Sequence, residues 1–261
     1  MSGFRLAVAQ SPGELTGKTA RLDWLGKALD KVAKNGADLV LLPELFSCGY
    51  NLGNRLIDKV EPSDGETATS LAQLANEFGI AIHYGYAELS DGKIYNAAQC
   101  IGPDGFVLGH HRKLAIPPGF ERDIFVAGQG CQLFSYRGFK IATLICYDAE
   151  FPETFRHVAA LGADLVLVPT ALGEKWGWVA NKMIPTRAFE NGVFLAYSNS
   201  AGIENGLHFL GESFIATPDG REIARAGRDP EIVYANLDRG LVAKAQARLP
   251  YLVDRQKLRL T

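Results

Sequence analysis

Apolar residues recur in two patterns along the first part of the chain. Residues Arg5–Gln10 form a short apolar run that predicts a strand, and Lys18–Asn35 has the periodicity of an amphipathic helix. The apolar positions of this helix recur at steps of three and four: Leu22, Leu25, Leu29 and Val32. Gly36 stands where a helix C-cap is expected. The next run, Ala37–Pro43, lacks polar alternation, which predicts a strand covered on both faces.

The same patterns continue through the rest of the chain. They predict helices over 67–78, 152–161 and 178–191, and strands over 80–89, 94–101, 106–111 and 139–145. The sequence Gly102-Pro103-Asp104-Gly105 predicts a turn between two of these strands. Strands alternating with helices in this way indicate an α/β protein.

An internal repeat relates the two halves of the sequence. The octapeptide GADLVLLP at 36–43 returns as GADLVLVP at 162–169, and the turn sequence Pro-Asp-Gly at 103–105 returns at 218–220. Because these strands are too apolar to face water, we expect two sheets packed face to face with helices outside. No Ser-rich or Gly-rich linker separates the halves, so residues 1–261 are predicted to form a single domain.

Composition and charge exclude several classes of protein. Of the 261 residues 47% are hydrophobic, which is typical of a globular chain rather than a disordered one. Lys and Arg number 27 against 29 Asp and Glu, and this balance gives no basic field for nucleic acid. No apolar run approaches the ~18 residues that span a bilayer, and residues 1–10 do not resemble a signal peptide. We therefore expect a cytoplasmic protein that binds neither nucleic acid nor membranes.

Several kinds of functional site find no support in the sequence. It contains no GxxxxGK or GxGxxG loop for a nucleotide and no GxSxG motif for a serine nucleophile. Its five histidines show no metal-binding spacing, and the neighbours His110 and His111 would point to opposite faces of a strand. The four cysteines are scattered without a CxxC pair, which indicates reduced thiols. We expect neither a metal nor a cofactor.

Cys146 occupies the position of a nucleophile. It ends the predicted strand at 139–145 and precedes a predicted helix, so its thiol would lie at a tight turn near helix-terminal N–H groups that favour a thiolate. Taken alone, however, Cys146 could be a buried structural cysteine, Glu44 a strand-end ion-pair partner and Lys113 part of a solvated face. Local sequence leaves these alternatives open.

Together, the three residues resemble the Glu-Lys-Cys triad of the nitrilase superfamily of carbon-nitrogen hydrolases. The resemblance is carried by Leu42-Pro43-Glu44, His111-Arg112-Lys113 and Cys146-Tyr147-Asp148, in this order, and extends from Ala7-Val8-Ala9-Gln10 to Pro250-Tyr251-Leu252. It implies an αββα four-layer sandwich with an internal pseudo-two-fold repeat. The repeated octapeptide agrees with that architecture.

The resemblance also implies a role for each residue. Glu44 would be the general base, Cys146 the nucleophile that forms a thioester, and Lys113 with the Tyr147 N–H the oxyanion stabiliser. Glu121, eight residues after the lysine, matches a second glutamate of the related aliphatic amidases, where it would orient the lysine or the substrate amide. The alternative for Glu121 is an exposed loop acid.

Departures from the family patterns bear on the substrate. The lysine is followed by Leu114-Ala115-Ile116 rather than Thr-His-Leu, and the nucleophile lies in Cys-Tyr-Asp rather than the Cys-Trp-Glu of nitrile-hydrolysing members, which favours amides. Relatives acting on carboxylate-bearing substrates have Arg where this chain has Glu150. A neutral or cationic small aliphatic amide, an ω-amino amide among them, is therefore expected. The expected substrate-binding residues are Tyr50, Tyr147, Glu150 and Trp176, with Glu174 as a second acid.

Three alternatives to this reading are an N-carbamoyl amino acid hydrolase, an ω-amidase, and a non-catalytic scaffold with the same fold. A further alternative for Glu150 is an ion pair with Arg156. Members of this superfamily commonly pair through outer helices, so we expect at least a homodimer. The segments 151–161 and 249–260 offer apolar residues for that contact.

Overall fold

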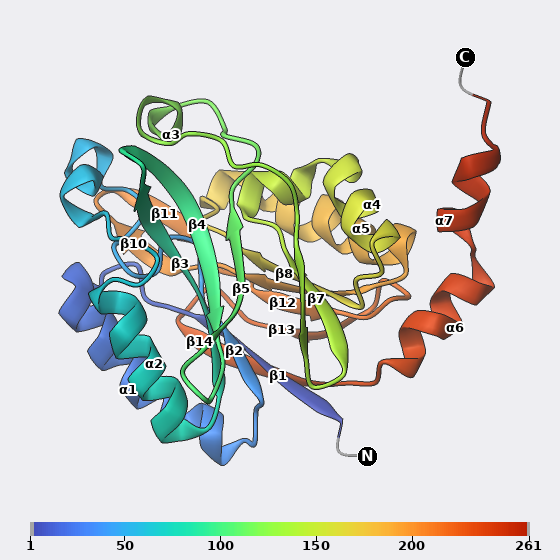
Figure 1. Ribbon diagram of the computed structural model, residues 1–261, viewed down its shortest axis with the longest axis horizontal. Helices are drawn as coiled ribbons and strands as arrows, with labels where there is room; N and C mark the ends of the chain where they lie inside the picture. The colour runs from blue at the N-terminus through green and yellow to red at the C-terminus, as the bar shows by residue number, and fades with distance from the viewer. Residues whose placement is uncertain (1–2, 260–261) are drawn as a thin grey trace.

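The computed structural model of the protein describes residues 3–259. Met1 and Ser2, of the segment 1–10 that does not resemble a signal peptide, lie outside the described residues, as does Leu260 of the segment expected at a dimer contact. Figure 1 shows two sheets in the middle of the molecule, with α1 and α2 on one outer side and α4 and α5 on the other. None of the helices within 3–259 is both long and apolar enough to cross a membrane.

The first sheet has the strand order β14-β1-β2-β3-β4-β5. Its central strands β1, β2 and β3 are parallel, and β14, β4 and β5 are added antiparallel at the two sides. The strands are β1 (Phe4–Gln10), β2 (Leu39–Leu41), β3 (Ala81–Ser90), β4 (Lys93–Ile101), β5 (Val107–Arg112) and β14 (Glu231–Leu237).

The second sheet has the order β13-β12-β9-β8-β7-β6 and the same plan. Strands β7, β8 and β9 are parallel, with β6 antiparallel on one side and β12 and β13 on the other. Its strands are β6 (Leu133–Tyr136), β7 (Phe139–Thr143), β8 (Leu165–Pro169), β9 (Phe194–Ser198), β12 (Phe214–Ala216) and β13 (Glu222–Arg225). The hairpin of β10 (Ala201–Glu204) and β11 (Leu207–Leu210) stands apart as a two-stranded sheet.

The matching plans of the two sheets confirm the internal repeat seen in the sequence. The two octapeptides form β2 and β8, each the middle strand of a parallel trio. The two Pro-Asp-Gly turns connect β4 to β5 and β12 to β13, again at equivalent places. The order of the elements therefore follows a pseudo-two-fold arrangement.

Three apolar layers hold the sandwich together. Alternate residues of the central strands explain why these strands are apolar throughout: Leu39 and Leu41 pack between the two sheets, whereas Val40 and Leu42 pack against helices. One layer joins the first sheet to α1 and α2, a second joins the two sheets, and a third joins the second sheet to α4 and α5. The expected αββα four-layer sandwich is confirmed.

The helices lie close to where periodicity predicts them. Their bounds are α1 (Gly17–Lys34), α2 (Glu66–Phe78), α3 (Phe120–Ile124), α4 (Pro152–Ala160), α5 (Ile184–Asn191), α6 (Gly240–Arg248) and α7 (Tyr251–Asp254). Gly36 has a φ of 67° and donates its N–H to Ala33, as expected for a residue that ends a helix. In Figure 1, α6 and α7 extend along one side, away from the sheets.

Three predicted boundaries were wrong. The strand expected over 37–43 is limited to β2, and the strand expected over 139–145 stops at Thr143, because the chain turns there to place Glu44 and Cys146. The helix expected over 178–191 begins as a five-residue π-helix, Val179–Met183, before α5. Hydrophobic periodicity does not distinguish a π-turn from an α-turn over so few residues.

Candidate active site

The four polar residues expected at the site lie at the ends of different elements. Glu44 follows β2, Lys113 follows β5, Glu121 lies in the short α3, and Cys146 follows β7 at the start of a 3₁₀ turn, Cys146–Glu150. Parallel strands within one sheet place their carboxyl ends at the same edge, which is where α/β proteins build their sites. The fold brings Glu44, Lys113 and Glu121 into direct contact, with Cys146 beside them.

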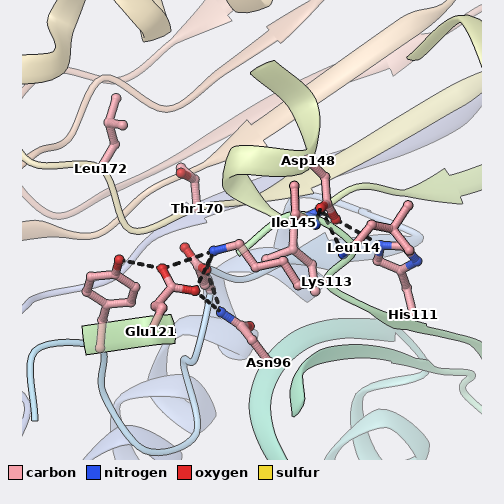
Figure 2. A network of polar contacts seen from close by, with 12 residues as sticks. Asn96, His111, Lys113, Leu114, Glu121, Ile145, Asp148, Thr170 and Leu172 are labelled. Atoms are coloured by element: carbon pink, nitrogen blue, oxygen red, sulfur yellow. Dashed lines mark hydrogen bonds and ion pairs between the residues drawn. The ribbon is translucent and has the colours of Figure 1, made fainter. Parts of the chain in front are cut away.

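Lys113 is the centre of a buried ionic cluster. Its Nζ donates to Glu44 Oε1 at 2.7 Å and to Glu121 Oε2 at 2.7 Å and Oε1 at 3.1 Å. The side chains of all three residues are almost fully excluded from solvent. Figure 2 shows Lys113 extended toward the Glu121 carboxylate, with Asn96 reaching the same carboxylate from below. The interpretations of Lys113 as a solvated residue and Glu121 as an exposed loop acid are therefore wrong. Glu44 is an ion-pair partner after a strand, as the alternative held, but its partner is the buried Lys113 of the cluster.

Two further side chains complete this cluster. Asn96 on β4 donates its Nδ2 to Glu44 Oε1 at 2.7 Å and to Glu121 Oε2 at 3.2 Å. Tyr50 donates its hydroxyl to Glu121 Oε1 at 2.7 Å. The second oxygen of Glu44, Oε2, is buried and has no hydrogen-bond partner within the described residues. Of the two carboxylates, Glu44 thus has an oxygen free to accept a proton.

The electrostatics follow from burying two carboxylates with one ammonium. Burial raises the pKa of Glu44 against the opposing effect of Lys113, and Glu121 raises it further. Burial alone would lower the pKa of Lys113, but the Glu44 and Glu121 carboxylates outweigh burial and keep the pKa above its ordinary value. Burial also raises the pKa of the Cys146 thiol, Glu44 adds to the effect, and Lys113 and Thr170 oppose it. The raised pKa favours the protonated form of the thiol.

The backbone at Cys146 is held in an uncommon conformation. Its φ is 47°, in the left-handed region that non-glycine residues rarely adopt. The Tyr147 N–H lies in the first turn of a helical segment, where backbone donors have no partner within the helix. Strain of this kind persists where the surrounding structure enforces it and is frequent at functional sites.

Asp148 fixes this turn to the segment that carries Lys113. Its Oδ1 accepts the N–H groups of Leu114 at 2.9 Å and Ala115 at 2.8 Å, and its Oδ2 accepts the Ile145 N–H at 3.1 Å. His111 Nε2 lies 3.0 Å from the same Oδ2. Figure 2 shows Asp148 above these partners, so one buried carboxylate sets the relative position of the thiol and the lysine.

A glycine allows Glu44 to reach the cluster. A Cβ at Gly85 of β3 would lie 2.4 Å from the Leu45 nitrogen and 2.9 Å from the Glu44 Cα. Leu45 itself has a φ of 49°, so the chain turns sharply directly after the acid. Only a residue without a side chain lets the turn that carries Glu44 pack against β3 at this distance.

Cys146, beside the cluster, lines a cleft of about 860 Å³. Cys146 and the expected residues Tyr50, Tyr147, Glu150, Glu174 and Trp176 all line it. Trp176 is half exposed at 54%, so it lies toward the solvent side. The remaining lining residues are largely apolar and come from both halves of the chain: Pro117, Pro118, Phe120, Ala171, Leu172 and Leu207 among them. A concave, mostly apolar cleft with a few polar groups at its floor is typical of a small-molecule site.

The environment of Glu150 differs from the expected ion pair. Arg156 hydrogen-bonds the Glu190 carbonyl at 2.6 Å and lies 3.7 Å from its carboxylate instead. Within residues 3–259, neither an ion pair nor a hydrogen bond engages the Glu150 carboxylate. Burial raises its pKa, while Lys113 and Arg187 oppose the effect. The alternative that Glu150 pairs with Arg156 is therefore wrong.

Three contributors to the site were not predicted from sequence: Asn96, Asp148 and Thr170. Asn96 carries no local signal, since its role depends on the pairing of β4 with β3. Thr170 could have been found, because it occupies the place in the second octapeptide repeat that Glu44 occupies after the first. Among the described residues, no group of three His, Cys, Asp or Glu side chains is placed to hold a metal ion.

Comparison with known proteins relates this chain to a family of hydrolases and to amidases. The Carbon-nitrogen hydrolase family model matches residues 5–247. The "Hydrolase in pqqF 5'region" of Pseudomonas protegens is 43% identical over 223 residues, which are 84% of this chain and 78% of that protein. The "(R)-stereoselective amidase" of a Pseudomonas species is 34% identical over 235 residues, 89% of this chain and 85% of that one. The solved structure of an amidase from Nesterenkonia sp. AN1 with butyramide superposes with a TM-score of 0.86 at 32% identity, covering 98% of both chains.

Proposed function

Because the chain belongs to the carbon-nitrogen hydrolase family of the nitrilase superfamily, we propose that it hydrolyses a small aliphatic carboxamide to the carboxylic acid and ammonia. The amidases among its relatives support an amidase-type hydrolase. The observation that carries the proposal is the buried contact of Lys113 with both Glu44 and Glu121 beside the Cys146 thiol.

In the first half of the proposed reaction, Cys146 forms a thioester. The free Oε2 of Glu44 takes the thiol proton, which neutralises one of two buried carboxylates. The sulfur attacks the amide carbonyl carbon, and the carbonyl oxygen becomes an oxyanion that the Lys113 ammonium and the Tyr147 N–H stabilise. Glu44 then returns its proton to the leaving nitrogen, the carbon–nitrogen bond breaks, and ammonia departs.

In the second half, water replaces ammonia. Glu44 takes a proton from the water and the hydroxide attacks the thioester carbonyl carbon. The carbon–sulfur bond then breaks to release the acid, and Glu44 returns its proton to the sulfur, which regenerates the thiol. A solved form of the Nesterenkonia amidase with covalent addition of an acetamide moiety at its active-site cysteine supports this role for Cys146. Glu121, anchored by Tyr50 and Asn96, would keep Lys113 oriented throughout.

The substrate that we propose is neutral or cationic at its far end. Two acids, Glu150 and Glu174, line the same cleft as Cys146 against one lysine, Lys175. The Glu150 carboxylate is unpaired among the described residues, and this excess of acid favours an ammonium over a carboxylate. The cleft has room for such a tail beyond the reacting amide. The motifs Cys48-Gly49-Tyr50-Asn51 and Pro250-Tyr251-Leu252 are also similar to those of 5-aminopentanamidase, which acts on an ω-amino amide.

Ammonia release from a matched series of five-carbon amides tests this proposal. The amides end in ammonium, methyl or carboxylate, and we expect kcat/KM to fall in that order. Glu150→Gln should lower the ratio of kcat/KM for the ammonium substrate to kcat/KM for the methyl substrate by about tenfold. This is the effect of losing one charge–charge contact of ~1.4 kcal/mol in a partly solvated cleft. Glu153→Gln, an exposed acid in the first turn of α4, is the matched control and should leave the ratio unchanged.

Each other outcome has a distinct meaning. The highest kcat/KM for the carboxylate substrate would contradict the charge argument and favour an ω-amide hydrolase. Turnover of N-carbamoyl amino acids in preference to all three amides would favour the carbamoyl hydrolase. Absence of ammonia release from every amide would favour a scaffold.

A further inference from the structure

A buried ion pair lies behind the cleft wall and joins the two halves of the chain. Arg21 of α1 donates its Nη2 to Glu204 Oε1 of β10 at 2.7 Å, and both side chains are more than nine-tenths buried. The hairpin that begins with β10 also carries Leu207 and His208, which line the cleft. This ion pair plays no part in the chemistry described above.

The second oxygen of Glu204 holds the segment that carries Tyr50. Oε2 accepts the backbone N–H groups of Tyr50 at 2.8 Å and Asn51 at 2.7 Å. Asn51 and Asn205 strengthen the same junction, because each donates its side-chain amide to the other's carbonyl, at 3.1 Å and 2.9 Å. One carboxylate thus serves three donors from two distant parts of the chain.

Gly49 allows the Arg21–Glu204 ion pair to lie directly against the backbone of the Tyr50 segment. A Cβ at Gly49 would lie 2.3 Å from Glu204 Oε1 and 2.9 Å from Arg21 Nη2. Gly49 also has a φ of 102°, which strongly disfavours residues with a side chain. A buried ion pair of this kind is weak evidence for stability, since an apolar pair of similar volume is often as stable. Its geometry, rather than its energy, is the feature to explain.

A short chain of contacts leads from the ion pair to the reacting groups. Glu204 fixes the Tyr50 backbone, the Tyr50 hydroxyl donates to Glu121 Oε1 at 2.7 Å, and Glu121 contacts Lys113 Nζ. The Tyr50 ring also packs edge-on against Phe120, with centroids 5.1 Å apart. We propose that Glu204 is a positioning residue, which orients Glu121 and Lys113 through Tyr50 and so sets the rate of the chemical step.

A double-mutant cycle of Glu204→Gln and Tyr50→Phe tests this inference, which rests on the amidase function proposed above. Gln has one acceptor oxygen where Glu204 serves three donors, so it must release Arg21 or the Tyr50 segment. We expect each single variant to lower kcat by about tenfold with KM changed less than threefold, the size of one lost hydrogen bond. Because both changes act through the Tyr50 hydroxyl, the double variant should lose no more than the worse single variant.

Asp164→Asn is the matched control for the cycle. Asp164 is also a buried carboxylate that accepts a backbone N–H, from Lys140 at 2.8 Å, and pairs with an arginine, Arg239, at 3.0 Å. It precedes β8, whereas the cleft lies beyond the other end of that strand. This variant should keep kcat while lowering stability.

Alkylation of Cys146 by iodoacetamide provides a second readout of the double-mutant cycle, one that does not depend on amide hydrolysis. The alkylation rates of the parent protein, the two single variants and the double variant should show the same non-additivity as kcat. The proposal for Glu204 can therefore fail or stand whether or not the amides are hydrolysed. If Glu204→Gln does not fold, Arg21→Lys replaces it, because lysine keeps the charge but not the guanidinium geometry. Multiplicative losses in the double variant, in either readout, would overturn the positioning role, as would unchanged rates in Glu204→Gln.

Discussion

The corners that follow β1 and β7 are equivalent in the two sheets but differ in their chemistry. Leu6 pairs with Leu39 in the first sheet as Ile141 pairs with Leu165 in the second, so Ser11 and Cys146 each lie five residues beyond an equivalent position. Ser11 is buried, with its hydroxyl 3.3 Å from that of Ser200. Cys146 instead faces the cleft.

The difference lies in what covers each corner. After β1 the chain pairs with β10, since Pro12 forms a bridge with Ala201 and the Ser11 carbonyl accepts the Ala201 N–H at 2.9 Å. After β7 the chain turns into a 3₁₀ segment and leaves the thiol accessible from the cleft. The duplicated scaffold thus supplies two similar corners, and only the uncovered one carries the cluster.

The two sheets have a second pair of equivalent positions, Glu44 after β2 and Thr170 after β8. Substitutions at these two positions should differ most in their effect on kcat. Glu44→Gln keeps the shape but removes the proposed base, and we expect kcat to fall by about 100-fold to 10,000-fold. Thr170→Val removes one polar contact near the thiol and should cost about tenfold at most. Steady-state kinetics measures both, and equal losses in the two variants would mean that Glu44 is not the base.

A smaller effect, on stability, is expected at the interface between the two sheets. Thr143 in the second sheet occupies the position equivalent to Val8 in the first. His83 of β3 lies with its Nε2 2.9 Å from the Thr143 hydroxyl. Burial, with a contribution from His111, lowers the pKa of His83 to about 3, whereas an unfolded histidine titrates near 6.5. Between these values the unfolded chain binds a proton that the folded chain does not, so acid destabilises the protein by up to ~1.4 kcal/mol per pH unit.

His83→Gln removes this dependence while keeping a donor for Thr143. We expect the Tm of the parent protein to fall more steeply than that of the variant as the pH is lowered from 6.5 to 4.5. Thermal unfolding followed by circular dichroism measures the two slopes. Parallel curves would show that His83 is not the group that titrates.

The two outer helix layers also differ, which bears on assembly. Helices α1 and α2, which are described in full, expose no large apolar side chain, whereas Leu161 after α4, Phe189 of α5 and Tyr251 of α7 are exposed. Phe189 and Tyr251 pack against each other with centroids 6.4 Å apart. We therefore propose that two copies pair through the second layer, and light scattering at micromolar concentration should give twice 28.3 kDa. A particle of 28.3 kDa would contradict this pairing.

Leu161→Glu should shift that equilibrium toward the monomer, because it places a charge in the proposed contact. Lys31→Glu on α1 is the control, since it lies in the last turn of a helix in the other layer. A dimer unaffected by Leu161→Glu would mean that another face makes the contact.

Sequence predicts five of the six central parallel strands, all but β9, together with the helices that cover them, because both signals are local and apolar. The octapeptide repeat alone placed β2 and β8 at equivalent positions of two sheets. The strands β6 and β9 to β14 were not predicted, since most of them are short and all acquire their pairing from partners elsewhere in the fold, as β14 does from β1. The family motifs placed Glu44, Lys113, Glu121 and Cys146, whereas Asn96 and Asp148 act through contacts between segments that only the folded chain brings together.

The most direct test of the central claim is mass spectrometry of the protein during turnover of a slow amide. The account predicts one acyl group per chain, located by peptide mapping on Cys146, together with one equivalent of ammonia released before the acid appears. Cys146→Ala, with an unchanged circular dichroism spectrum, should form no adduct and release no ammonia. An acyl group on Cys48, Cys100 or Cys131, or ammonia release by the Cys146→Ala variant, would contradict the account.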